Sequence, residues 1–127
     1  MRPQWTVAAL AALTIDLAAC ATKNASSAQP QPERTAVSVK NDNWLDVTIF
    51  AVRGGARTRL GFVTGMSRGT FPVPSDFVPD GTLQLMVDPV GSSATYVTDK
   101  IVVNSGQHVE LTVATVLRMS SFAVWSQ

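Results

Sequence analysis

Apolar and polar residues alternate in several short runs between residues 36 and 125 of this chain. Each run is bounded by glycine, proline, asparagine or aspartate. A period of two residues indicates half-buried β-strands, because successive side chains of a strand point to opposite faces of a sheet. The runs expected to form strands are 36–40, 44–53, 58–63, 70–74, 82–88, 94–98, 100–103 and 108–114. The runs 94–98 and 100–103 are either two short strands or one strand with a bulge at Asp99, and 116–125 is either a last strand or a short covering segment.

The residues between these runs predict how the strands connect. Gly54-Gly55 indicates a tight hairpin turn over 53–57, because paired glycines adopt positive φ without steric cost. Pro72 and Pro74 confine the run 70–74 to a sheet edge, because proline lacks a backbone N–H. No helical period of useful length follows Cys20. Seven or eight short strands at this spacing predict an all-β fold, a single antiparallel β-sandwich.

The first twenty residues have a different pattern. Arg2 precedes a mostly apolar run over residues 5–19, and small residues come directly before Cys20. This is the three-part layout of a secretory signal. The run is shorter than the roughly 20 residues that a membrane-spanning helix needs, and Asp16 interrupts it. A signal that is removed is therefore favoured over a permanent transmembrane helix.

Leu17-Ala18-Ala19-Cys20 resembles the lipobox of bacterial lipoproteins. The resemblance implies cleavage between Ala19 and Cys20, a diacylglycerol thioether on the Cys20 thiol and further acylation of its new amine. It also implies a bacterial cell-envelope location, and the absence of aspartate after Cys20 favours the outer membrane, facing the periplasm. Cys20 is the single cysteine, so no internal disulfide forms. The alternative is an ordinary signal peptide followed by an accidental cysteine.

The chain therefore divides into three parts. Residues 1–19 form the lipoprotein signal peptide, residues 20–35 the lipidated cysteine and a flexible tether, and residues 36–127 the β-sandwich domain. The tether is assigned because 21–35 is rich in Ser, Ala, Gln and Pro and has no apolar period. The strand pattern of 36–114 also resembles small immunoglobulin-like or transthyretin-like domains of exported bacterial proteins. That resemblance implies a fold and carries no functional residues.

Composition argues against several classes of function. Ten Lys+Arg balance nine Asp+Glu, so the basic bias of a nucleic-acid-binding protein is missing. A metal site needs clustered ligands, and Asp76 with Asp80 in one loop is the best carboxylate pair, although turns favour such residues anyway. His108, the single histidine, is expected to face outward from its strand. We therefore expect no metal, no cofactor, no catalytic residues and no enzymatic activity.

Two sets of residues are candidates for contact with a partner. Arg53, Arg57 and Arg59 flank the predicted hairpin, and Arg68 lies in the next loop. Guanidinium groups bind carboxylate or phosphate with two parallel hydrogen bonds, so this set fits lipid headgroups, an anionic saccharide or a protein. The alternative is a solvated hairpin whose arginines deter edge pairing.

The second set is aromatic. On one sheet face it would form a carbohydrate or protein platform, but packing in the core is the favoured reading. Its members are Trp44, Phe50, Phe62, Phe71, Tyr96 and Trp125.

These observations lead to three hypotheses. The first is a lipid-anchored, non-enzymatic binding or accessory module of the cell envelope, with its membrane contact through Cys20 and a protein or saccharide as partner. The second is a structural subunit that pairs with an envelope partner through an exposed strand edge. The third is a small envelope hydrolase. Exposed aromatic residues would favour the first, a long unpaired edge strand the second, and a pocket around His108 with two carboxylates the third.

Overall fold

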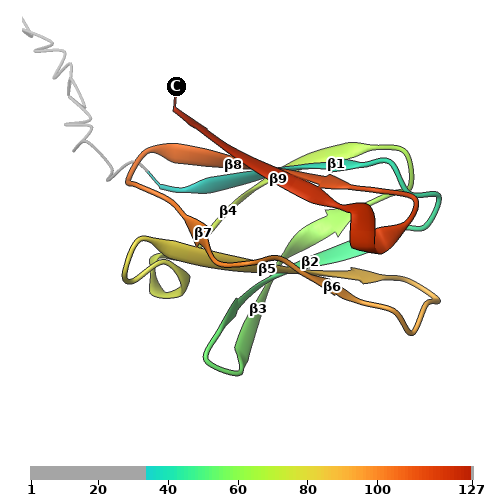
Figure 1. Cartoon of the computed structure of the whole chain (residues 1–127), viewed down its shortest axis with the longest axis horizontal. Coiled ribbons are helices and arrows are strands. Elements are labelled where there is room, and N and C mark those ends of the chain that lie inside the picture. Colours follow the sequence, from blue (N-terminus) through green and yellow to red (C-terminus); the bar gives the residue numbers. More distant parts are fainter. Residues whose placement is uncertain (1–33, 127) are drawn as a thin grey trace, which may run out of the picture.

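The structure is a computed structural model that describes residues 34–126 (Figure 1). Residues 1–33 lie outside the described part, and with them the predicted signal peptide, its cleavage site between Ala19 and Cys20, the lipidation site and most of the tether. Within residues 34–126, no helix has the length and hydropathy needed to cross a bilayer.

The described chain forms nine β-strands in two facing sheets, with two short 3-10 turns. One sheet has the order β4-β1-β8-β9, and the other has the order β3-β2-β5-β6, with β7 also paired to β5. In chain order the elements are β1 (Ala36–Asn41), β2 (Val47–Arg53), β3 (Ala56–Val63), β4 (Arg68–Pro72), η1 (Ser75–Phe77), β5 (Thr82–Pro89), β6 (Tyr96–Val97), β7 (Ile101–Val102), β8 (Gln107–Val113), η2 (Leu117–Met119) and β9 (Ser121–Ser126).

The all-β sandwich predicted from the sequence is confirmed, with one parallel strand pair. β1 and β8 run parallel, with Val37 opposite Val109 and Val39 opposite Leu111, and all other pairs are antiparallel. A parallel pair cannot be joined by a hairpin, and β1 and β8 come from opposite ends of the domain sequence. Short-range alternation therefore gives no information about this pairing.

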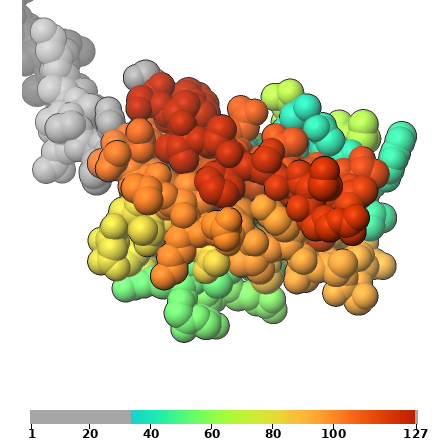
Figure 2. All heavy atoms as spheres, viewed as in Figure 1, coloured from blue at the N-terminus to red at the C-terminus, as the bar shows by residue number. Residues whose placement is uncertain are grey.

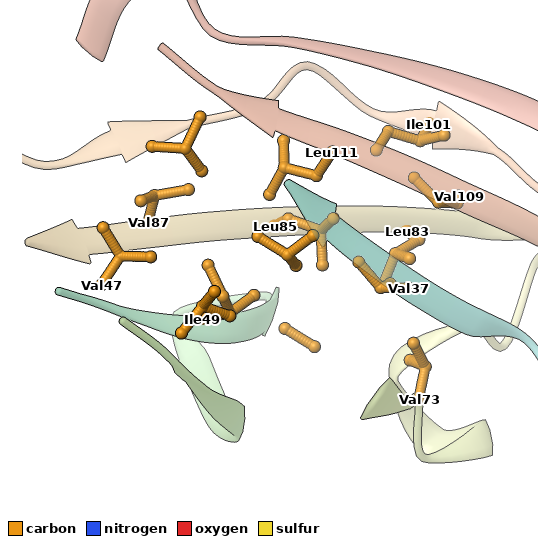
Figure 3. Packing of buried hydrophobic residues seen from close by; sticks show 14 of the residues in the cluster. Val37, Val47, Ile49, Val73, Leu83, Leu85, Val87, Ile101, Val109 and Leu111 are labelled. Carbon is orange, nitrogen blue, oxygen red and sulfur yellow. The ribbon is translucent and has the colours of Figure 1, made fainter. Parts of the chain in front are cut away.

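Alternating residues of both sheets meet in an aliphatic core (Figure 3). Leu83, Leu85 and Val87 point inward from β5, as their spacing predicts, and Val109 and Leu111 point inward from β8. Burial of one such leucine or valine contributes about 1.5 to 3 kcal/mol. The fully buried hydrophobic residues of the cluster are all Val, Ile, Leu or Ala. The core is thus filled without a fully buried aromatic side chain among the described residues.

The predicted hairpin is also confirmed. β2 ends at Arg53 and β3 begins at Ala56, and Gly54 and Gly55 have φ values of 53° and 82°. Two successive residues with positive φ are what a two-residue hairpin of type I′ requires. β4 lies at a sheet edge, as its prolines predict.

Two segments differ from the sequence prediction. The strand expected over 44–53 begins only at Val47, and Leu45, which alternation places on the same face as Val47 and Ile49, is 42% exposed whereas those two are buried. The runs 94–98 and 100–103 shrink to two residues each, because buried Thr98 interrupts the ladder. Its hydroxyl accepts a hydrogen bond from the Leu85 N–H at 3.0 Å. Residues 116–125, for which the sequence left a strand and a covering segment as alternatives, form η2 followed by the strand β9.

Candidate functional site

The sandwich has two poles, which we name by their place in the chain. At the entry pole the described chain begins at Arg34, β1 starts, and the β2–β3 hairpin turns (left in Figure 1). At the distal pole β1, β5 and β8 end and β2 begins (right in Figure 1). Four loops meet at the distal pole: 42–46, 64–67, 90–95 and 114–120.

Large apolar side chains are exposed on all four distal loops. They are Trp44 at 76%, Met119 at 69%, Met66 at 58%, Val90 at 53%, Val116 at 48% and Leu45 at 42%. Single exposed apolar residues are normal, but several gathered at one place on a protein mark an interaction surface. Figure 2 shows the stretches of chain that meet there, on the right of the molecule. We call these six residues the distal platform, and they are the candidate functional site.

Buried Asn41 is the first residue that holds the loops of this platform. Its side-chain N–H group donates to the carbonyl oxygens of Leu45 at 2.9 Å, Thr64 at 3.1 Å and Val63 at 3.4 Å. Its side-chain oxygen accepts the backbone N–H of Asn43 at 3.0 Å. One amide therefore joins the loops 42–46 and 64–67, and it is 1% exposed.

Asn43 extends the network to the third loop. Its amide N–H group donates to the carbonyl oxygens of Ala114 and Thr115, both at 3.1 Å, and its side-chain oxygen accepts the Leu45 N–H at 3.0 Å. Its backbone carbonyl accepts the Met66 N–H at 3.1 Å. Buried polar groups of this kind are costly unless satisfied, so fully satisfied networks give loops a unique geometry.

Asp46 connects the fourth loop. Its carboxylate accepts the Gly65 N–H at 2.8 Å, and its carbonyl oxygen accepts the Val90 N–H at 2.8 Å. Thr115 adds a bond from its hydroxyl to the carbonyl oxygen of Asp42 at 3.0 Å. The loop 42–46 is thus hydrogen-bonded to each of the other three. The platform side chains therefore belong to loops whose backbone is held by hydrogen bonds. A partner would bind without a large free-energy cost for ordering these loops.

Met66 has an unusual backbone conformation within this platform. It is the one non-glycine residue with positive φ among residues 34–126, at 60°. It is the third residue of a turn closed by a hydrogen bond from Ser67 N–H to the Thr64 carbonyl oxygen, a place that favours glycine. The glycine stands one position earlier, because a Cβ at Gly65 would overlap the Trp44 carbonyl oxygen. A strained methionine that exposes its side chain is typical of functional sites.

The predicted arginine set is divided between two places. Arg53, Arg57 and Arg59 lie on the β2–β3 hairpin, whereas Arg68 begins β4 in the other sheet, opposite Lys40. The Arg53 guanidinium donates to the Asp76 carbonyl oxygen at 2.6 Å, and Arg57 lies over the Phe50 ring at 5.0 Å from its centroid. Two of the three hairpin arginines therefore have intramolecular contacts, and the four form no single cluster.

The predicted aromatic set is also dispersed. Phe71 and Tyr96 pack partly against the core, and the Tyr96 hydroxyl donates to the Ser120 carbonyl oxygen at 3.1 Å. Phe62 is 41% exposed on β3, and Trp125 is 42% exposed on β9. Core packing thus accounts for part of the set only, and Trp44 alone belongs to the distal platform.

The remaining candidates are one histidine and one pair of carboxylates. His108 faces outward, as predicted, and stacks on Trp125 with 5.0 Å between ring centroids. Asp76 and Asp80 are both exposed. In the part of the chain that the structure describes, no three His, Cys, Asp or Glu side chains are grouped to hold a metal ion.

A hollow of about 770 Å³ lies at the entry pole. Arg34 and Thr35, residues 72–75 and residues 103–105 line most of it. Neither a histidine nor a carboxylate side chain is among its lining residues. The hollow therefore lacks the arrangement that the hydrolase hypothesis requires, a pocket around His108 with two carboxylates.

The distal platform was not predicted from the sequence. Alternation includes Trp44 and Leu45 in the strand expected over 44–53, and Asn41, Asp42 and Asn43 only separate that run from the preceding one. The sequence does contain a signal for this part of the platform: Asn and Asp residues stand directly before Trp44 and Leu45. Their side chains can bond the neighbouring backbone, and this keeps the residues that follow out of a strand. The contributions of Met66 and Met119 depend on tertiary structure and had no local signal.

A search against protein-family models found none that matches the chain, and a search of curated proteins found no similar protein.

Proposed function

We propose that this chain is a lipid-anchored, non-enzymatic binding module of the bacterial cell envelope, whose distal platform binds an apolar patch on another envelope protein. The observation that carries the proposal is the gathering of six exposed apolar side chains on hydrogen-bonded loops at one pole. The anchor rests on the lipobox-like Leu17–Cys20 sequence. An outer-membrane position facing the periplasm follows from the same resemblance.

The geometry favours a protein as the partner. Arg34 enters the domain at the entry pole, so a domain held by its N-terminal side presents the distal pole away from the anchor. Trp and Met are enriched in protein interfaces, and interfaces have an apolar centre with a polar rim. Charged residues lie beside the platform: Lys40 near the end of β1 forms an ion pair with Asp42 at 2.9 Å, and Arg68 begins β4 opposite Lys40.

The anchor is tested by the intact mass of the membrane-extracted protein beside a Cys20→Ser variant. We expect the mass of residues 20–127 plus acyl chains, and a variant that is uncleaved and unlipidated. A soluble, cleaved and unmodified wild-type protein would contradict the anchor, but it would leave the distal platform to be tested separately.

The platform is tested by a Trp44→Ser, Met66→Ser, Met119→Ser variant of the full chain. Intact cells are treated with formaldehyde, and cross-linked complexes are resolved by mass. We expect complexes of the wild type that the variant loses. The matched control is Val97→Ser with Val102→Ser, which removes exposed apolar residues (46% and 69%) from strands outside the distal loops. Equal loss in both variants would contradict a platform confined to the distal pole.

A further inference from the structure

The four sheet edges of the sandwich differ in how they are protected against pairing with another strand. Unpaired N–H and C=O groups on an edge recruit other strands, and proteins block this with charges, prolines, bulges or very short strands. β4 carries Arg68 and Pro72, β3 carries Arg57 and Arg59 with a register shift opposite Ile49/Phe50, and β6 has only two residues. Three edges thus have a recognised protection.

β9 has none of these protections. Its sequence, Ser-Phe-Ala-Val-Trp-Ser, contains no charge, no proline and no glycine, and it pairs over its whole length with β8 on one side. Five of its six residues are exposed, and Figure 2 shows it in red along the visible surface. Phe122, although opposite buried Leu111, is still 37% exposed. Among residues 34–126, no other strand pairs with β9 on its second side.

We infer that β9 pairs antiparallel with β9 of a second copy of this chain, joining two four-stranded sheets across a two-fold axis. Such an axis perpendicular to the sheet keeps each face continuous, so residues of one face oppose residues of the same face. The outer face of β9 carries Ser121, Ala123 and Trp125, and the core-side face carries Phe122, Val124 and Ser126.

The two central registers place either Ala123 opposite Ala123 of the second copy, or Val124 opposite Val124 of the second copy. In the first register Trp125 faces Ser121 of the second copy, and in the second it faces Ala123. In both registers the Trp125 ring lies opposite a small residue. Like charges opposite each other would destabilise the pair, and neither register contains any. The other long edges are less suited: the central registers of β3 bring Arg59 opposite or diagonal to Arg59 of the second copy, and β4 contains Pro72, which cannot donate a ladder hydrogen bond. This self-complementarity favours a second copy over an unrelated strand.

The test uses the full chain expressed in a bacterium as two versions with different peptide tags after Gln127, extracted from membranes in detergent. We expect the two wild-type versions to co-purify. Ala123→Lys in both versions puts two ammonium groups opposite or diagonal to each other, and we expect at least about a fivefold loss of co-purification. One version with Ala123→Lys and the other with Ala123→Asp should restore it.

Thr70→Lys, on the outer face of the other edge of the same sheet, is the matched control and should co-purify like the wild type. If Ala123→Lys does not fold, Ala123→Asp in both versions replaces it, because it also brings two like charges opposite or diagonal to each other. The inference is overturned if wild-type versions do not co-purify, or if Ala123→Lys leaves co-purification unchanged. It is also overturned if the substitution releases a different protein while the copies stay together. The pairing through β9 does not depend on the lipid anchor or on the distal platform. A negative result here would therefore leave both of those proposals standing.

Discussion

The two poles of this sandwich are both built from loops, yet their loops are held differently. At the distal pole, side chains of Asn41, Asn43 and Asp46 bond the backbone of neighbouring loops, and the exposed surface is apolar. At the entry pole, the hairpin turns through two exposed glycines, the exposed Arg53 side chain bonds the backbone of Asp76, and both polar and apolar residues line the hollow. A hydrogen-bonded loop backbone with exposed apolar side chains is the more suitable arrangement for binding another protein, because less binding free energy is lost in ordering the loops.

The largest expected loss of stability comes from Asn41→Ala at the distal pole. The substitution leaves three carbonyl oxygens and the Asn43 N–H without their side-chain partner, and we expect a loss of about 3 kcal/mol in the free energy of unfolding. Urea denaturation measures it. Asn104→Ala at the entry pole is the control: Asn104 is exposed and its hydrogen bond to the Gln107 side chain comes from its backbone N–H, so the effect should stay within about 0.5 kcal/mol. Similar losses at both positions would contradict the difference between the poles.

A smaller loss is expected from Gly65→Ala. The new Cβ meets the Trp44 carbonyl oxygen, which is backbone and cannot rotate away, so the loops 42–46 and 64–67 must separate. We expect about 2 kcal/mol of destabilisation in the same denaturation measurement. Ser93→Ala, in another distal loop and exposed, is the comparison and should be near neutral. An unchanged midpoint for Gly65→Ala would show that the two loops are not held at this distance.

Met66→Gly is expected to stabilise the domain, in contrast to the two preceding substitutions. Glycine adopts positive φ without the cost that an L side chain carries, so we expect about 1 kcal/mol of stabilisation, seen as a higher denaturation midpoint. The same variant should weaken cross-linking to the partner, since it removes a side chain that is 58% exposed on the platform. Met119→Gly, which has no positive φ to relieve, serves as the control for stability. Destabilisation by Met66→Gly would mean that the methionine is kept for packing.

These elements also show what can be read from the sequence. Strands with regular alternation, such as β5 and β8, were predicted with their inward residues, and Gly54-Gly55 identified the hairpin. These features depend on residues close in the chain. The parallel pairing of β1 with β8, and the platform contributed by four loops, depend on residues that are far apart in the sequence. No local pattern encodes which loop ends meet.

The smallest effect is expected from Arg57→Ser with Arg59→Ser on the hairpin. Arg57 contacts the Phe50 ring on an exposed surface, and such a contact contributes about 0.5 to 1 kcal/mol. We expect a similar loss of stability and no change in membrane or partner retention at low salt. Reduced retention would assign binding to the hairpin, at the pole opposite to the distal platform.

The most direct test of the account places a photo-cross-linking residue at position 44 or at position 57 of the full chain in living cells. Trp44 is the most exposed of the platform residues, whereas Arg57 marks the hairpin at the other pole. The account predicts a cross-link from position 44 to one envelope protein that is lost on adding Met119→Ser, and no such cross-link from position 57. Cross-links from position 44 to lipid alone, or equal protein cross-links from both positions, would contradict it.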